Sequence, residues 1–307
     1  MSNSCHTTQR LLGNAREKKF FVCVRGAITA LSNSPPAMSS FFQRWMDEAD
    51  DDQLDVVQRV VQRGQLEFVN GGWCMHDEAA PSYVDMIDNT GLGHRLIASQ
   101  FGVSAVPSAT WQIDPFGHSA TQASLLSSPL GGFSSVFVGR IDFQDRAARQ
   151  NATSLETIWR ASPTLGASAQ TFYSMMNGYG PVKWCWDEVA CNGGDVPVLD
   201  DPTLEDYNVD YFINETVAAA LAFAAPYRPD ADGTVHLIWP MGSDFQYVNA
   251  FGWYKNLDRL IHYVNEGQSA VNLLYSTPSI YAEAKLGQNM SWPLKTDDGM
   301  PYFDGGW

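Results

Sequence analysis

The chain has 307 residues, of which 45% are hydrophobic and 12% aromatic, so it can bury a substantial core and is not a disordered segment. Its 34 acidic and 19 basic residues give a formal net charge of −15, which repels polyphosphate and argues against a nucleic-acid partner or an anionic membrane surface. An uncharged substrate suits this composition better.

The sequence contains neither a membrane span nor a clear export signal. No stretch reaches the roughly 18 uninterrupted apolar residues that a transmembrane helix needs. Residues 20–31 come closest to a signal sequence, behind Lys18 and Lys19. Arg25 splits that apolar run and no small-residue cleavage site follows it. We therefore expect no signal peptide and no membrane partner.

From about residue 50, helical and strand periods alternate. A helix is predicted between the capping residues 50–52 and Gly64, because its apolar residues repeat on one face: Leu54, Val57, Val60 and Val61. Residues 66–69 then indicate a short strand that ends in the turn 70–72. A second helix is predicted over 83–101, where Gly91 and Gly93 weaken the middle and are candidate points of division.

The alternation continues further along the chain, and the last dozen residues are loop-like. Further strands are predicted at 108–113, 135–138, 235–239 and 271–275, with a helix at 120–126 and a helical face formed by Trp253, Leu257, Leu260, Ile261 and Val264. This order predicts an α/β fold with a mostly parallel sheet covered by helices, either a barrel or an open doubly wound sheet.

Two regions depart from the alternation. Residues 151–232 are rich in Gly, Pro, Asn and Asp and indicate a long irregular insertion between strands. Residues 1–37 show no convincing alternation, so we treat them as an atypical N-terminal segment preceding a domain over 38–307.

Three polar residues follow predicted strands and are candidates for a site. Asp114, Arg140 and Asp244 each stand just past a strand end, where parallel α/β folds place their chemistry. Taken alone, Asp114 also fits an Asp-Pro turn, and Asp244 fits a helix N-cap or a surface turn. Two carboxylates facing an uncharged substrate suggest glycoside hydrolysis.

The histidines form no self-contained metal motif. The six are His6, His76, His94, His118, His236 and His262, and no two of them make an H-x-H or H-x-x-x-H pair. His118, four residues after Asp114, favours hydrogen bonding that stiffens the turn over metal ligation. His236 lies in an apolar strand and fits a satisfied core residue. Phosphate-loop, dinucleotide and G-x-S-x-G motifs are absent from the sequence.

Cysteine and asparagine patterns bear on the compartment. Cys185 and Cys191 lie close enough in sequence for a short-loop disulfide, and two unpaired thiols fit the spacing equally well. Asn-x-Ser/Thr acceptor sites begin at Asn151, Asn214 and Asn289. With the acidic balance, these patterns favour a secretory or lysosomal compartment.

Five blocks of sequence resemble family 38 of the glycoside hydrolases, closest to its lysosomal α-mannosidases. They are LEFVNGGWCMHDEA at 66–79, WQIDPFGHS at 111–119, FVGRIDFQD at 137–145, MGSDFQY at 241–247 and WYKNLDRLI at 253–261. Their order and spacing follow the family from about residue 40 to 304. The resemblance implies a seven-stranded β/α barrel catalytic domain that, in this chain, is followed by none of the family's downstream helical and β domains.

The resemblance also implies roles for particular residues. The family members are retaining exo-hydrolases that remove α-linked mannose from N-glycan oligosaccharides, with zinc at the base of the pocket. Asp114 matches the nucleophile and one zinc ligand, and Asp244 matches the general acid and base. Arg140 and Tyr179 match substrate-binding positions, and Cys185 pairs with Cys191. The compartment implied is lysosomal or vacuolar.

The chain departs from the family at both ends. The family's H-x-D pair, which supplies two zinc ligands, has no counterpart in residues 1–37, and one or two N-terminal strands lack a match. The ligand histidine of the downstream H-H-D segment also has no counterpart. Three of four zinc ligands are therefore missing, which leaves an inactive fragment or sugar-binding relic as the alternative. A metal-dependent polysaccharide deacetylase is a more distant alternative. Oligomeric state is not indicated.

Overall fold

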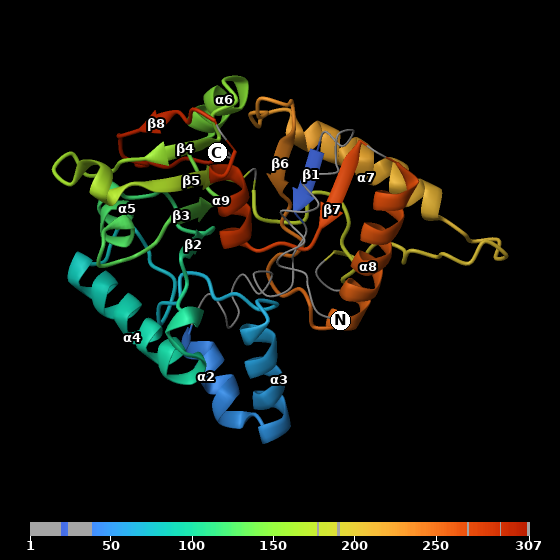
Figure 1. The fold of residues 1–307 in the computed structure, drawn as a ribbon, viewed down its shortest axis with the longest axis horizontal. Helices are drawn as coiled ribbons and strands as arrows, with labels where there is room; N and C mark the ends of the chain where they lie inside the picture. Colours follow the sequence, from blue (N-terminus) through green and yellow to red (C-terminus); the bar gives the residue numbers. More distant parts are fainter. Residues whose placement is uncertain are drawn as a thin grey trace.

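The computed structural model describes residues 20–23, 39–176, 178–188, 191–268, 270–288 and 290–305. Strands and helices alternate along most of this length (Figure 1). In chain order the elements are β1 (Phe20–Cys23), α2 (Ser39–Glu48), α3 (Asp51–Gln62), α4 (Tyr83–Phe101), η1 (Val103–Ala105), β2 (Ala109–Gln112), α5 (Ala120–Ser127), β3 (Ser135–Val138), α6 (Phe143–Asn151), β4 (Glu156–Trp159), η2 (Gly166–Ala169), β5 (Thr171–Met175), α7 (Val209–Ala224), β6 (Val235–Ile238), α8 (Ala250–Gly267), β7 (Val271–Leu274), α9 (Pro278–Leu286) and β8 (Leu294–Lys295).

The strands form two sheets. One has the order β6–β1–β7 and is parallel throughout, and the other has the order β2–β3–β5–β4–β8. The second sheet is mixed, because β4 runs antiparallel to β5 while the other pairs are parallel. The α/β class predicted from the sequence is confirmed. Among the described residues no ladder joins the two sheets, so closure into a seven-stranded barrel stays a prediction.

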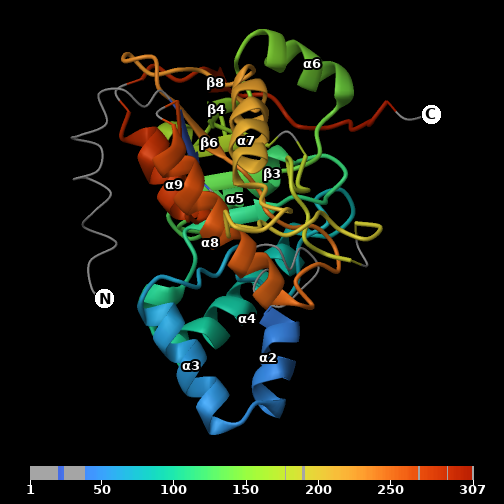
Figure 2. The same cartoon turned by 90° about the vertical axis from the view of Figure 1, so that its right-hand side faces the viewer.

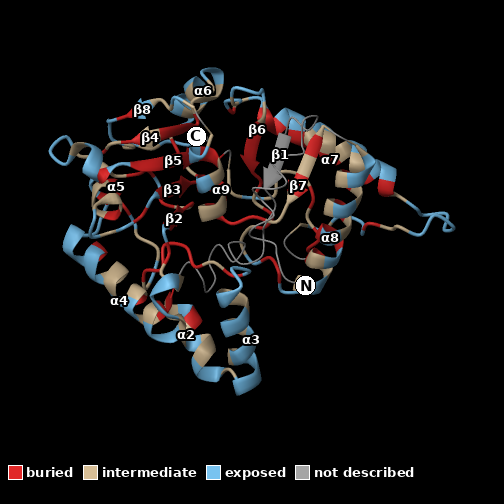
Figure 3. Ribbon diagram, viewed as in Figure 1, coloured by how far each residue is buried: buried red, intermediate tan, exposed pale blue. Residues whose placement is uncertain are grey.

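The helices cover the sheets unequally. Helices α7 and α8 pack together on the outer side of the three-stranded sheet, and α9 lies between the two sheets, against β6 and β3 (Figure 1). Helices α2, α3 and α4 project from one end of the molecule, around a small core of Phe42, Phe68 and Ile97 (Figure 2). The strands of the five-stranded sheet are largely buried, whereas these projecting helices are mostly exposed (Figure 3).

A buried ion pair on α9 connects the two sheets. Lys285 is fully buried, and its Nζ lies 2.8 Å from Oε2 of Glu156 on β4. The same ammonium donates to the main-chain oxygen of His236 on β6, at 3.3 Å. Tyr281 also donates to both Glu156 and His236. Burial of these charges is tolerable because each has a partner.

Several elements differ from the sequence prediction. Leu66, Phe68 and Val69 are buried, but residues 66–69 form no strand, because only Asn70 at their end bonds to β2, from its N–H to Ala109 O. The segment 151–232 is not wholly irregular, since it contains β4, β5 and helix α7. Residues 20–23, considered only as part of an export signal, form the central strand of the three-stranded sheet.

Helix α4 is continuous, so the prediction that Gly91 and Gly93 divide it is wrong. Gly93 serves a packing role instead. A Cβ at that position would lie 2.0 Å from the main-chain oxygen of Gly71, so only glycine allows the helix to rest on the turn after residue 70. None of the helices in the described part of the chain is both long and apolar enough to cross a bilayer.

We predict that Lys285→Met lowers the free energy of unfolding by about 3–5 kcal/mol, because it leaves the Glu156 carboxylate buried without its cation. The double variant Lys285→Met/Glu156→Leu should recover most of that loss, since it removes both charges. Urea denaturation at neutral pH measures the free energy of unfolding of the single and the double variant. Equal losses in the single and double variants would contradict the assignment of the cost to an unpaired charge.

Acid should also weaken the fold through His236. Burial, and then the Lys285 charge, lower the pKa of His236 from 6.5 to about 4. The unfolded chain therefore binds more protons between these values, and the free energy of unfolding falls as the pH drops from 6.5 toward 4, by about 3 kcal/mol. His236→Gln removes this contribution, so its stability at pH 4 and pH 7 should differ less than that of the wild type in urea titrations.

Candidate active site

Strands β2 and β3 place the first two candidate residues side by side. The register sets Gln112 opposite Val138, two residues before Asp114 and Arg140 respectively. Both chains therefore leave the sheet at the same edge. Pro115 follows Asp114 directly, which keeps the aspartate out of helical geometry and fixes the corner that presents its carboxylate.

Asp114 and Arg140 form an ion pair that Tyr179 joins. Arg140 donates to Asp114 Oδ1 from Nε at 2.7 Å, and its Nη2 lies 2.6 Å from the same oxygen. The Tyr179 hydroxyl lies 3.2 Å from that oxygen and 3.2 Å from Arg140 Nη2. The structure thus brings together three of the four residues that the sequence and its resemblance selected.

Gly139 makes this close approach possible. A Cβ on this residue would lie 2.5 Å from the main-chain oxygen of Ile113 and 2.8 Å from the Tyr179 ring. Any larger residue would separate the two strand ends that carry Asp114 and Arg140. The glycine before Arg140 is therefore a requirement of the site rather than an incidental turn residue.

A cleft of about 410 Å³ opens beside this ion pair. Such a volume suits a small uncharged ligand such as one or two sugar rings. Its walls come from the segments after β3 and β5, the start of helix α6, the loop after β6 and the C-terminal segment: Gly139, Arg140, Ile141, Phe143, Arg146, Gly178, Tyr179, Gly180, Ser243, Tyr302 and Asp304.

Asp244 lies on the loop that follows β6, next to Ser243, which lines this cleft. Phe245 and Tyr247 in that loop have φ values of 62° and 67°, in the left-handed region that non-glycine residues rarely adopt. Tyr247 is held there by stacking on Trp253 and by donating to the main-chain oxygen of Met241. Strained backbone of this kind concentrates at functional loops.

The electrostatics of Tyr179 connect the two carboxylates. Burial, and then the charges of Asp114 and Asp244, raise the pKa of the Tyr179 phenol, while Arg140 opposes them. Both carboxylates therefore act on one hydroxyl in the cleft, although they follow strands of different sheets. The 5 to 5.5 Å separation between carboxylates that a retaining glycosidase needs stays a prediction for this pair.

The C-terminal segment contributes residues that the sequence reasoning missed. Tyr302 accepts a hydrogen bond from Arg140, and its ring lies 5.7 Å from that of Phe116. Phe116 in turn lies under the Arg140 guanidinium, 4.7 Å from ring centroid to Cζ. Although desolvation lowers the pKa of Arg140, the bonds to Asp114 and Tyr302 outweigh it and raise the pKa. The Pro-Phe-Gly turn beside Asp114 was the one sequence signal for Phe116.

A disulfide lies beside the Asp244 loop. Cys185 and Cys191 are bonded, as the family resemblance implied. The side-chain amide of Gln246 donates to both sulfurs at 3.3 Å. The disulfide therefore contacts the loop two residues from Asp244. Of the predicted glycosylation sites, Asn151 and Asn214 are exposed and Asn289 lies outside the described residues.

The described residues do not form a zinc site. Among residues 39–305, apart from the few positions left out, no three His, Cys, Asp or Glu side chains gather where a metal could bind. Asp114 is the one zinc ligand that the resemblance implies for this chain. Its Oδ1 already accepts hydrogen bonds from Arg140 and Tyr179. His118 is occupied by hydrogen bonds, as the sequence favoured. The residues that the structure describes therefore do not fit the metal.

Comparisons with known proteins agree on one family. Residues 36–305 match the glycosyl hydrolases family 38 N-terminal domain. The chain is 51% identical to an alpha-mannosidase of Canavalia ensiformis over 267 residues, covering 87% of this chain and 26% of that protein. It is 44% identical to the lysosomal alpha-mannosidase of Cavia porcellus over 272 residues, with 87% and 26% covered. The chain thus spans about a quarter of the length of these relatives.

A solved structure shows the same fold at low sequence identity. An alpha-mannosidase from Enterococcus faecalis V583 superposes with a TM-score of 0.57 and 16% identity, covering 96% of this chain and 27% of that one. At that level of identity the match speaks for the fold alone.

We predict that Asp114→Asn and Asp244→Asn each lower the pKa of Tyr179, because each removes a negative charge that disfavours the phenolate. The Tyr179 pKa is measured by following the ¹³C NMR signals of the tyrosine ring carbons against pH, and Tyr179→Phe identifies the Tyr179 signal. Asp55→Asn, on exposed helix α3, is the control and should leave it unchanged. If Asp244→Asn left the Tyr179 pKa unchanged while Asp114→Asn lowered it, the two carboxylates would not share this cleft.

Proposed function

Since the chain belongs to glycosyl hydrolase family 38, we propose that it carries the catalytic centre of a retaining exo-α-mannosidase. The substrate proposed is the terminal α-linked mannose of N-glycan oligosaccharides. The observation that carries the proposal is the Asp114–Arg140–Tyr179 cluster, which opens on a sugar-sized cleft that Asp244 also influences. A lysosomal or vacuolar location is proposed with it, supported by lysosomal relatives and by the disulfide.

In the proposed mechanism Asp114 is the nucleophile and Asp244 the acid and base. Asp114 attacks the anomeric carbon while Asp244 protonates the departing oxygen, which gives a covalent mannosyl ester. Asp244 then removes a proton from water, and the water displaces Asp114 with net retention of configuration. The role of Asp114 is supported by its environment, because Arg140 contacts its carboxylate directly and a neighbouring cation favours the charged form that a nucleophile needs.

Arg140 and Tyr179 are proposed to bind the sugar. Both line the cleft and hold Asp114 from one side, so Oδ2 of the carboxylate is the oxygen left for attack. Their donors can also meet sugar hydroxyls at the cleft wall. Zinc is implied by the family, and we derive no step through it because the described residues do not fit it.

The fold and domain boundaries form part of the same proposal. We infer that residues 38–307 make up a family 38 catalytic β/α domain and that the two sheets are parts of its barrel. Support comes from the family match over 36–305 and from α9, which packs between the sheets against β6 and β3.

A sugar-binding protein without turnover is the second candidate. It is favoured by the described residues, among which no three side chains gather into a group that could bind a metal. Such a protein would bind mannose in the cleft through Arg140 and Tyr179 without cleaving a glycosidic bond.

The test is hydrolysis of p-nitrophenyl α-mannoside and of an α-linked mannobiose, with and without added zinc. We expect the first product to be α-mannose by ¹H NMR, and Asp114→Asn to abolish turnover. Asp244→Ala should lose about 100-fold or more on mannobiose and less on p-nitrophenyl mannoside, whose leaving group needs no proton. Azide should then increase the turnover of p-nitrophenyl α-mannoside by Asp244→Ala.

Asp55→Asn serves as the control and should keep full activity. Hydrolysis that survives Asp114→Asn would overturn the assignment of the nucleophile. Absence of turnover in the wild type, together with calorimetric binding of mannose that Arg140→Met removes, would favour the sugar-binding candidate.

A further inference from the structure

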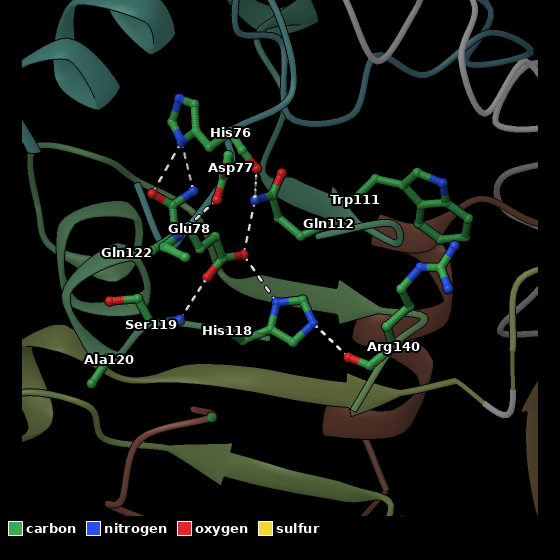
Figure 4. A network of polar contacts seen from close by, with 12 residues as sticks. His76, Asp77, Glu78, Trp111, Gln112, His118, Ser119, Ala120, Gln122 and Arg140 are labelled. Carbon is green, nitrogen blue, oxygen red and sulfur yellow. Dashed lines mark hydrogen bonds and ion pairs between the residues drawn. The ribbon is translucent and has the colours of Figure 1, made fainter. Parts of the chain in front are cut away.

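Next to the Asp114–Arg140 ion pair lies a hydrogen-bonded pair that is buried and unused by the proposed mechanism. His118 Nδ1 lies 3.0 Å from Oε1 of Glu78, and the two side chains are only 1% and 2% exposed (Figure 4). Glu78 comes from the loop before α4, whereas His118 ends the turn that begins at Asp114. Burying such a pair is costly unless every polar atom is satisfied.

Glu78 meets that condition. Its Oε1 accepts from Gln112 Nε2 at 2.8 Å as well as from His118, and its Oε2 accepts from the main-chain N–H of Ser119 at 2.8 Å. Gln112 is the last residue of β2, two before Asp114. The carboxylate therefore ties the end of β2 to the far side of the Asp114 turn.

His118 is fixed in both its main chain and its ring. Its N–H and C=O pair with Gly299, at 3.1 and 2.9 Å. The ring then lies between two acceptors, the Glu78 carboxylate and, at 2.8 Å from Nε2, the main-chain oxygen of Arg140. Because a main-chain oxygen can only accept, Nε2 is the donor to Arg140, and Nδ1 is hydrogen-bonded to the Glu78 carboxyl group.

These contacts form a closed circuit from Asp114 through His118 and Arg140 back to Asp114. The turn from Asp114 leads to His118, whose ring binds the main chain of Arg140, and the Arg140 side chain returns to Asp114. The position of the Arg140 guanidinium is thus set by its own side-chain contacts and also by the hydrogen bond that His118 makes to the main-chain oxygen of Arg140. A shift at His118 would move Arg140 relative to the carboxylate that it holds.

We propose that Glu78 and His118 are positioning residues, which hold Arg140 and through it the Asp114 carboxylate in the orientation for attack. The catalytic consequence rests on the proposed mannosidase function, whereas the geometric consequence does not. A misplacement of about 1 Å at a reacting group can cost about 100-fold in rate. Loss of the hydrogen bond from His118 to the main-chain oxygen of Arg140 should therefore be visible in kcat.

Two substitutions at His118 separate its two bonds. The amide nitrogen of His118→Gln reaches toward the place of Nε2 and keeps the bond to Arg140, whereas that of His118→Asn lies near Nδ1 and keeps the bond to Glu78. We expect His118→Asn to lower kcat about 100-fold with little change in KM, and His118→Gln to recover most of kcat. Glu78→Gln should lower kcat to an intermediate degree.

A purely structural role of His118 predicts a different order of activities among the variants. Then activity would follow stability in urea, and His118→Asn, which keeps the contact to buried Glu78, would be at least as active as His118→Gln. That order, or equal activity in both variants, would overturn the proposal.

An NMR measurement tests the geometry without relying on activity. The Arg140 Nε–H, bonded to Asp114, should give a slowly exchanging ¹⁵N–¹H signal that Arg140→Lys removes. His118→Asn should speed its exchange at least about tenfold, and His118→Gln should not. If the wild type hydrolyses no mannoside but shows this pattern, the proposed function fails and the positioning stands. A wild type without slowly exchanging His118 Nε2–H and Arg140 Nε–H signals would refute the positioning, whether or not the variants fold.

Discussion

The contact between Asp114 and Arg140 is the interaction around which the cleft is organised. It exists because β2 and β3 are parallel neighbours in a register that releases both residues at one edge, and because Gly139 leaves room for the two chains to meet. Tyr179, which follows the next strand, completes the group. A guanidinium and a phenol thus hold the carboxylate at one oxygen, Oδ1, by charge-assisted hydrogen bonds.

Two buried polar pairs connect the elements behind this group. Lys285 joins β4 to β6 from α9, and the Glu78–His118 pair joins the end of β2 to the main chain of Arg140. Both pairs are satisfied by several hydrogen bonds, which is the condition under which ionisable side chains persist in a protein interior. Buried pairs of this kind hold elements at one specific distance and angle, whereas apolar contacts tolerate small shifts.

Local patterns were enough to predict β2, β3 and α5, because a short apolar run or a helical period there ends at clear turn residues. They also placed Asp114 and Arg140 at strand ends. Strands β4 and β5 were missed because Thr157 and Ser174 interrupt their apolar runs, although both residues are buried in the sheet. Tyr302 could not be found either, since its contact with Arg140 depends on how the C-terminal segment crosses the Asp114 turn.

The contact of Gln246 with both sulfurs of the disulfide has a consequence for biosynthesis. The loop with Asp244 obtains one of its anchors only after oxidation, so maturation of the cleft is coupled to the thiol chemistry of the compartment in which the chain folds. A polypeptide made in a reducing cytosol would have every residue of the cleft and still lack this support for one of its walls. Recombinant production in an oxidising host, or refolding with a glutathione couple, is therefore the natural route to the complete site.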